Sequence, residues 1–342
     1  MKLINTREAV GHVICHDITI IVKDKIKDTA FHKGHVVREE DIDVLLSIGK
    51  DHLYVWEKNE DMYHEDEAAV ILADACQNAY MRRTAPKEGK IEIIAEADGL
   101  LQIDVERLME INSLDQMMIA TRHTNTPVKK GAKLAGTRII PLIIEKEKME
   151  AVKAIANPES PLLKILPFQR KTVGIVTTGN EVFYGRIKDT FTPVIREKME
   201  QYGVEVIGHK VIGDDMDAIT KAILELKEEG AQMILCTGGM SVDPDDRTPG
   251  AIKQTGANIL SYGAPVLPGA MFLLGYFEDG TPVMGLPGCV MYAKATIFDL
   301  ILPRVLANQT ITKKDLAALG HGGLCLGCDQ CHFPNCGFGK GV

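Results

Sequence analysis

Three glycine-containing loops in this sequence have the composition of an anion-binding site. Each loop directly follows an apolar run; the loops are 177–181 (TTGNE), 237–249 (TGGMSVDPDDRTP), and the pair 268–269 (PG) and 286–288 (LPG). Glycines let a ligand approach the backbone, and the amides around them can cradle a phosphate. Any one of these loops could be an ordinary turn, so the interpretation depends on their occurring together.

The residues that we expect to hold the anionic ligand are Thr178, Gly179, Gly238, Gly239, Ser241, Pro268, Gly269, Pro287 and Gly288. Acidic side chains accompany them. Glu181 could hold a cation or a polar ring, and Asp243, Asp245 and Asp246 could chelate magnesium beside a phosphate. The alternative for these aspartates is a solvated acidic turn that caps a helix.

The segments between these loops predict alternating strands and helices from Lys171 to about Ala307. Strands are expected at 172–177, 204–211 and 232–236, and helices beginning at Thr192-Pro193, at Asp214 or Asp215, and at Thr248-Pro249. A hairpin of 271–277 and 282–286 turned by Asp279-Gly280, and a helix from Gly288 to about Leu306, should follow. The predicted fold is α/β: a doubly wound, three-layer, mostly parallel sheet that binds ligands at the carboxyl ends of its strands.

A second candidate site lies near the end of the chain. Cys325, Cys328, Cys331 and Cys336 supply four thiols within a glycine-rich segment. Four cysteines so closely spaced predict a metal site, with two alternatives: zinc, held by all four or by three with His321 or His332, or an iron–sulfur cluster. The two-residue intervals resemble cluster-binding runs more than paired zinc knuckles.

The composition limits the function classes. The 342 residues are 45% hydrophobic and 25% charged, which suggests about two compact domains. A net charge of −8 excludes a general basic field for nucleic acid or a membrane surface. The first residues contain no apolar signal core, so we expect a cytoplasmic protein with reduced thiols. The uncharged stretch 254–277 contains too many glycines and prolines for a membrane span.

The remaining sequence predicts three domains: an α+β, β-rich region at 1–165, divisible at about residue 60; the α/β domain at 171–307; and a cysteine-rich tail at 308–342. Within the first region we expect helices at 40–47, 60–83 and about 105–111, and a linker at 157–167 ends it. His123 lies in a loop without a nearby nucleophile, so we interpret it as structural.

The ordered motifs carry a family resemblance. TTGNE at 177–181, VIGDDMDAI at 211–219, TGGMSVDPDDRTP at 237–249, PGAMF at 268–272 and GLPG at 285–288 resemble the MoaB/Mog-like, molybdopterin-binding domain of the MoeA/gephyrin-type molybdopterin molybdotransferases. Residues 33–55 also resemble the stretch that precedes this domain. The resemblance implies a homodimeric protein of molybdenum cofactor biosynthesis. Its ligand would be molybdopterin or adenylylated molybdopterin, which is hydrolysed with magnesium while molybdate is inserted at the dithiolene.

The resemblance also assigns roles to single residues. Glu181, Asp214 and Asp246 fall on acidic positions that the family uses near metal and molybdate, and Gly238, Gly239 and Ser241 match its ligand loop.

The sequence also departs from the family. Asn180 replaces a usual acid, residues 266–271 contain none of the usual lysines, Cys289-Val290 replaces Asn-Pro, and residues 1–60 have no Asp-Gly-Tyr motif. The resemblance thus supports pterin binding more strongly than insertion chemistry.

Three functions follow from these observations. The first is an enzyme that assists molybdenum insertion. The second is a non-catalytic carrier or sensor of the cofactor, whose tail reports metal or redox state or docks a molybdoenzyme or biosynthesis partner. The third is a pyrophosphatase that uses the same phosphate loops on another nucleotide.

Overall fold

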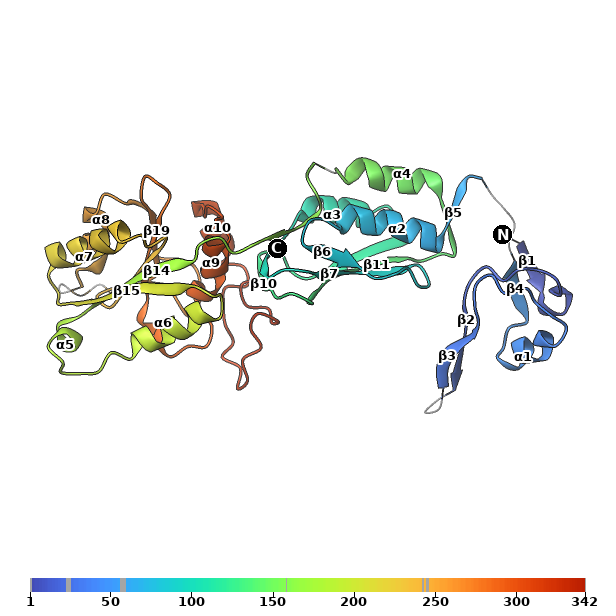
Figure 1. Ribbon diagram of the computed structural model, residues 1–342, viewed down its shortest axis with the longest axis horizontal. Coiled ribbons are helices and arrows are strands. Elements are labelled where there is room, and N and C mark those ends of the chain that lie inside the picture. Colours follow the sequence, from blue (N-terminus) through green and yellow to red (C-terminus); the bar gives the residue numbers. More distant parts are fainter. Residues whose placement is uncertain are drawn as a thin grey trace. The chain divides into compact units, whose positions relative to one another are not determined.

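The computed structural model describes residues 2–22, 26–55, 60–157, 159–241, 243 and 246–341. They divide into two compact units (Figure 1). Unit 1 comprises Met1–Glu96, Ile103–Arg122 and Lys130–Lys164, and unit 2 comprises Ala97–Gln102, His123–Lys129 and Ile165–Val342. None of the helices in the described ranges has the length and apolar character needed to cross a bilayer.

Unit 2 is built on a six-stranded sheet with the order β15-β14-β16-β19-β18-β17. Its strands are β14 (Thr172–Thr178), β15 (Glu205–Ile212), β16 (Ile234–Thr237), β17 (Asn258–Tyr262), β18 (Leu273–Tyr276) and β19 (Pro282–Leu286). β14, β15, β16 and β19 run parallel, whereas β17 and β18 are antiparallel to their neighbours. The predicted mixed α/β architecture and the β18–β19 hairpin are confirmed.

Alternate residues of the strands enter two hydrophobic clusters. Val173 and Ile175 of β14 join the cluster that contains residues of α6 (Phe191–Glu200) and α9 (Ile297–Leu306), whereas Val176 joins residues of α7 (Met216–Glu228) and α8 (Thr248–Gln254). Successive side chains of a strand point to opposite faces, so both faces of β14 are covered (Figure 1). This double burial explains why the strand is apolar almost throughout.

The helix starts differ from the prediction in two places. Asp189, not Thr192, caps α6: its Oδ1 accepts from the amides of Phe191 at 2.8 Å and Thr192 at 3.0 Å. The helix expected directly after Gly288 begins only at Ile297. Residues Gly288–Met291 form the 3-10 turn η2 instead, and a capping box of Thr296 and Asp299 fixes the later start.

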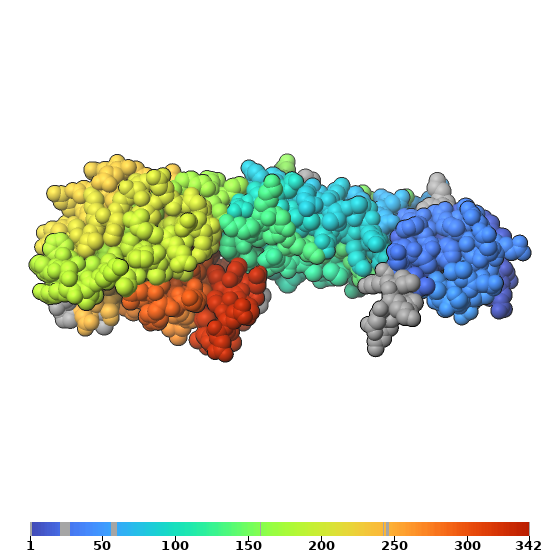
Figure 2. All heavy atoms as spheres, turned by 60° about the horizontal axis from the view of Figure 1, so that its bottom comes forward, coloured from blue at the N-terminus to red at the C-terminus, as the bar shows by residue number. Residues whose placement is uncertain are grey.

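The other elements of unit 2 are short. They include α5 (Asn180–Phe183) and α10 (Lys313–Ala318), and the end of the chain follows α10 as a surface-exposed lobe, red in Figure 2.

A three-stranded sheet has the order β10 (Thr126–Val128), β8 (Gly99–Ile103) and β13 (Leu163–Leu166). The predicted linker at 157–167 is therefore partly a strand, because β13 pairs with β8.

Unit 1 contains two groups of elements. The first group is β1 (Lys2–Asn5), the turn η1 (Thr6–Glu8), β2 (Ile18–Val22), β3 (Ile26–Phe31), α1 (Asp41–Ser47) and β4 (His52–Val55). The second group is β5 (Met62–His64), α2 (Glu65–Cys76), β6 (Met81–Arg83), β7 (Lys90–Ala95), α3 (Val105–Asn112), β9 (Met117–Thr121), β11 (Lys133–Ile139), β12 (Ile143–Glu145) and α4 (Lys146–Ile155). The predicted helices near 40–47 and 105–111 are confirmed.

The predicted helix at 60–83 is wrong at both ends. α2 begins at Glu65 because the side chain of His64 caps its first turn in a capping box with Glu67. The chain leaves the helix at Gln77, and Met81–Arg83 pairs with β7 in the sheet β6-β7-β11-β9. The two arginines therefore belong to a strand, from which Arg83 forms an ion pair with Asp74 of α2.

Candidate functional site

The strand register brings the predicted loops to one edge of the unit 2 sheet. Thr178 pairs with Ile212, Thr177 with Thr237, and Thr237 with Leu286, so β14, β15, β16 and β19 end side by side. β18 runs antiparallel to β19 and begins opposite its end, which places the 263–272 loop at the same edge. We call this set of loops the carboxyl edge. It is where parallel α/β sheets bind their ligands.

Steric constraints explain why glycine occupies both positions after β16, Gly238 and Gly239. Gly238 has a φ of +83°, and a Cβ there would lie 2.1 Å from the Thr178 carbonyl oxygen. Gly239 has a φ of +53°, and its Cβ would lie 2.9 Å from Oγ1 of Thr248. Only glycine combines these dihedrals with such close approach. The loop after β16 is thus packed directly onto the ends of β14 and α8.

Five buried threonines connect these elements; we call them the threonine cluster: Thr177, Thr178, Thr192, Thr237 and Thr248. Oγ1 of Thr178 lies 2.9 Å from Oγ1 of Thr248 and donates to the Thr237 carbonyl at 3.2 Å. Thr248 Oγ1 also makes a 2.9 Å hydrogen bond to the Gly238 carbonyl.

Thr178 was predicted to touch the ligand, but its side chain is buried and hydrogen-bonded inside the threonine cluster. In the structure, the Thr178 hydroxyl therefore holds the ends of β14 and β16 and the start of α8 together. Sequence reasoning missed the other four threonines as a group. The signal was a set of threonines at the ends of β14 and β16 and in the first turns of α6 and α8.

His209 of β15 extends this cluster. Its Nε2 lies 3.0 Å from Thr177 Oγ1, 3.1 Å from Thr192 Oγ1 and 3.7 Å from Oδ2 of Asp189. Burial lowers the pKa of His209, and the nearby Asp189 opposes that shift in part. A neutral imidazole suits a site whose other members are hydroxyls. The sequence offered no motif around this residue.

The acidic residues lie in two loops of the edge. Asp214 and Asn180 form a reciprocal pair: Asn180 N–H donates to Asp214 Oδ2 at 3.0 Å, and Asp214 N–H donates to Asn180 Oδ1 at 3.3 Å. The adjacent Glu181 is exposed, and a Cβ on Gly179 would lie 2.7 Å from its carboxylate, so this carboxylate folds over the glycine. Asn180, a departure from the family pattern, thus fixes the position of Asp214.

Asp246 closes the turn in the loop after β16. Its Oδ2 accepts the amide of Asp243 at 3.2 Å, and its own amide donates to the Asp243 carbonyl at 3.0 Å. Asp245, the third predicted acid, lies outside the described residues. Within the described ranges, Glu181, Asp214 and Asp246 do not form a group with ligand atoms within 4.8 Å of one another.

Tyr262 holds the other side of this loop, and sequence reasoning missed it. Its hydroxyl donates to the Met240 carbonyl at 2.8 Å and to the Ser241 carbonyl at 3.3 Å. Burial is the main cause of its raised pKa, so the phenol keeps its proton. Ser241 itself is exposed. Its side chain is therefore open to a ligand while its backbone is fixed.

The two proline-glycine loops differ in their surroundings. The Pro268 carbonyl accepts the amide of Ile297 at 3.2 Å, and a Cβ on Gly269 would lie 2.4 Å from the Ile297 side chain, so this loop packs on the start of α9. Gly288 is exposed, and its Cβ position has no neighbour within 4 Å. The Pro287 carbonyl accepts the amide of Val290 at 3.0 Å. Of these two loops, the second leaves open space for a ligand.

The tail cysteines occupy two environments. Cys325 and Cys336 are partly buried against the larger hydrophobic cluster of unit 2, whereas Cys328 and Cys331 are exposed. No three of their sulfurs lie within 4.8 Å of one another in the described tail.

His123, interpreted as structural, lies with Nε2 3.0 Å from the Gly341 carbonyl.

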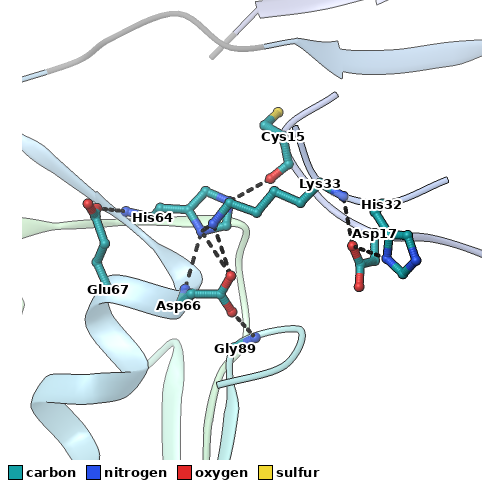
Figure 3. A network of polar contacts seen from close by, with 8 residues as sticks. All are labelled: Cys15, Asp17, His32, Lys33, His64, Asp66, Glu67 and Gly89. Atoms are coloured by element: carbon teal, nitrogen blue, oxygen red, sulfur yellow. Dashed lines mark hydrogen bonds and ion pairs between the residues drawn. The ribbon is translucent and has the colours of Figure 1, made fainter. Parts of the chain in front are cut away.

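A separate polar network occurs in unit 1 (Figure 3). His64, Glu65 and Asp66 have ligand atoms within 4.8 Å of one another. However, Lys33 Nζ lies 3.0 Å from His64 Nδ1 and 2.9 Å from Asp66 Oδ2, so an ammonium already neutralises this group. His64 Nε2 faces the Cys15 carbonyl at 2.6 Å. Burial raises the pKa of Glu65 to about 7. We interpret this network as contacts that connect Cys15 and Lys33 to the start of α2, and not as a metal site.

Comparisons with known proteins agree with the geometry of unit 2. Residues 174–307 match the family described as "Probable molybdopterin binding domain". This segment is therefore similar to a molybdopterin-binding domain. The match extends over all three loop regions of the carboxyl edge. Residues 3–57 match a domain of unknown function, DUF8806.

Curated relatives match a shorter segment. A CinA-like protein of Desulfosudis oleivorans is 41% identical over 80 residues, which are 23% of this chain and 19% of that protein. A putative competence-damage inducible protein of Bacillus mycoides is 38% identical over 81 residues, 24% of this chain and 19% of that protein. The chain thus spans about a fifth of the length of these relatives.

Among solved structures, the molybdopterin biosynthesis enzyme MoaB of Thermus thermophilus is 23% identical. The match covers 41% of this chain and 98% of that one, with a TM-score of 0.33.

Proposed function

We propose that unit 2 binds the anionic end of molybdopterin, or of adenylylated molybdopterin, at the carboxyl edge. The observation that carries this proposal is the packing of Gly238 and Gly239 against Thr178 and Thr248. It fixes the loop after β16 directly beside the strand ends, where backbone amides can meet a phosphate. The family match of residues 174–307 supports the same ligand class.

We expect some residues of the carboxyl edge to contact the ligand and others to hold the loop after β16 in place. Amides around Gly239 and the exposed Ser241 would contact the phosphate, while Tyr262 and the threonine cluster hold their backbone in place. The buried hydroxyls keep the loop rigid without contacting ligand. A preorganised loop loses little conformational entropy on binding.

Beyond pterin binding, we propose that unit 2 assists the insertion of molybdate, as the MoeA/gephyrin-type resemblance implies. Glu181 and Asp214 lie in adjacent loops, and Asp246 lies in the loop after β16. With magnesium, these carboxylates would neutralise the phosphate and orient molybdate. Magnesium would supply Lewis-acid chemistry at the phosphate when bound. The same resemblance implies a homodimer.

A carrier or sensor without insertion activity is the second candidate. One observation favours it: residues 266–271 contain no lysine, and Pro268-Gly269 packs on α9. The cations that would attract molybdate to this loop are thus absent from its sequence.

A single experiment separates these candidates. The full-length chain is mixed anaerobically with molybdopterin or with its adenylylated form, and bound pterin is measured after gel filtration. Magnesium and molybdate are then added and AMP is quantified. Pterin binding with AMP release supports the enzyme, and binding without AMP release supports the carrier. Absence of binding to both pterins would refute the proposed function.

A further inference from the structure

The chain after α10 forms a closed loop with a tight neck. The Gly339 amide donates to the Gly322 carbonyl at 2.9 Å. A Cβ on Gly341 would lie 2.2 Å from the His321 carbonyl oxygen, so the two ends of the loop touch at glycine. We call residues 323–338 the tail loop. The glycines of the neck are thus required where two backbone segments approach each other closely.

The base of the tail loop is fixed to unit 2. Leu267 N–H donates to the Gly323 carbonyl at 2.8 Å, and Cys325 N–H donates to the Leu267 carbonyl at 2.8 Å. Phe338 is buried in the larger hydrophobic cluster, and Phe333 packs against the same cluster. Their rings lie 6.1 Å apart in an edge-on arrangement. The loop therefore has a rigid origin on the folded domain.

All four tail cysteines lie inside this closed loop. Cys325 and Cys336 lie partly buried at its base, and Cys328 and Cys331 lie in its exposed part. Closure of the neck has already restricted the chain between the cysteines, so gathering their sulfurs costs less entropy than in an open tail. Thiolates are the ligands preferred by zinc and by iron–sulfur clusters.

We propose that the tail loop is a metal site in which Cys325, Cys328, Cys331 and Cys336 hold an iron–sulfur cluster. The cysteines follow one another after two, two and four residues, a single run rather than the two separated pairs of structural zinc sites. Since no three sulfurs of the described tail lie within 4.8 Å of one another, the exposed part must fold toward the base as the cluster assembles. Each thiol releases its proton on ligation.

The test uses the full-length protein isolated without oxygen. Iron, acid-labile sulfide and zinc are quantified per chain, and visible absorption is recorded before and after reconstitution with iron and sulfide. Iron and sulfide in matching amounts, with visible charge-transfer absorption, are expected. Cys328→Ser and Cys331→Ser should lose both. These residues are exposed, so the fold should survive, as hydrogen exchange of the unit 2 strands can verify.

Cys289→Ser is the matched control, because Cys289 is partly exposed like Cys325 but lies outside the tail loop. It should keep iron, sulfide and absorption at the level of the unchanged protein. Stoichiometric colourless zinc would overturn the cluster and leave a thiolate zinc site. Neither metal after reconstitution, or a disulfide within the loop of the anaerobic protein, would overturn the metal site altogether.

Discussion

Replacement of Gly238 by alanine tests the geometry of the carboxyl edge most directly. The added Cβ would lie 2.1 Å from the Thr178 carbonyl oxygen, and ordinary contacts begin at 3.4 Å, so the two backbones must separate by about 1.3 Å. Such a shift breaks hydrogen bonds of the threonine cluster, including that from Thr178 Oγ1 to the Thr237 carbonyl. No side-chain rotation can relieve it, because the backbone fixes the position of the Cβ and the contacting oxygen belongs to the backbone of Thr178.

The expected cost combines two effects. A left-handed backbone costs an alanine about 1 kcal/mol relative to glycine. Each of two lost buried hydrogen bonds adds about 1 kcal/mol. Gly238→Ala should therefore destabilise unit 2 by about 3 kcal/mol and weaken pterin binding strongly.

The matched control is Gly256→Ala. Gly256 has almost the same φ, +84°, but its Cβ position has no neighbour within 4 Å. This variant should lose only about 1 kcal/mol and bind pterin normally. Stability is measured by urea denaturation followed through hydrogen exchange of peptides from unit 2, and binding by gel filtration with pterin. Equal stability and equal binding of the two variants would refute the reasoning.

Three further predictions concern other contacts. Burial raises the folded pKa of Glu65 from its ordinary value of 4.5 to about 7, so the unfolded chain ionises first and stability falls as the pH rises from about 4.5 to about 7, by about 3 kcal/mol in total. Urea denaturation of unit 1 at pH 5 and 8 should show this loss, and Glu65→Gln should remove it; an unchanged pH dependence contradicts the assignment. Tyr262→Phe loses both hydrogen bonds to the 240–241 backbone, so pterin affinity should fall several-fold with little change in stability; unchanged affinity in the same gel-filtration assay would argue against its role. Thr248→Val leaves the Thr178 hydroxyl without that partner and should destabilise unit 2 by about 1–3 kcal/mol, whereas Thr248→Ser should restore most of the stability, both measured by urea denaturation.

The strands and loops of unit 2 could be predicted because their signals are local. Continuous apolar runs identified β14 and β16, and the glycines after them marked the loops. The helix at Met216–Glu228 was predicted from its cap and its apolar spacing, and the structure shows Asp215 as that cap. Each signal lies within a few residues of the element that it specifies.

Predictions failed where a distant partner decided the outcome. Arg82 and Arg83 look like the end of a helix, but pairing with β7 makes them a strand. Thr192 looks like a helix cap, yet its hydroxyl bonds in the threonine cluster with residues of β14 and β15. Sequence periodicity contains no information on which strand or hydroxyl will be adjacent in the fold.

The sequence by itself determined the α/β character of unit 2, the positions of its glycine loops and the cysteine content of the tail, because these depend on residue types and short spacings. Only the tertiary structure decided which glycines are required for close approach, which hydroxyls hold the edge together, and that the tail closes on itself beside Leu267. The reason is physical: these features depend on contacts between backbones far apart in the chain, which form only after the sheet has assembled.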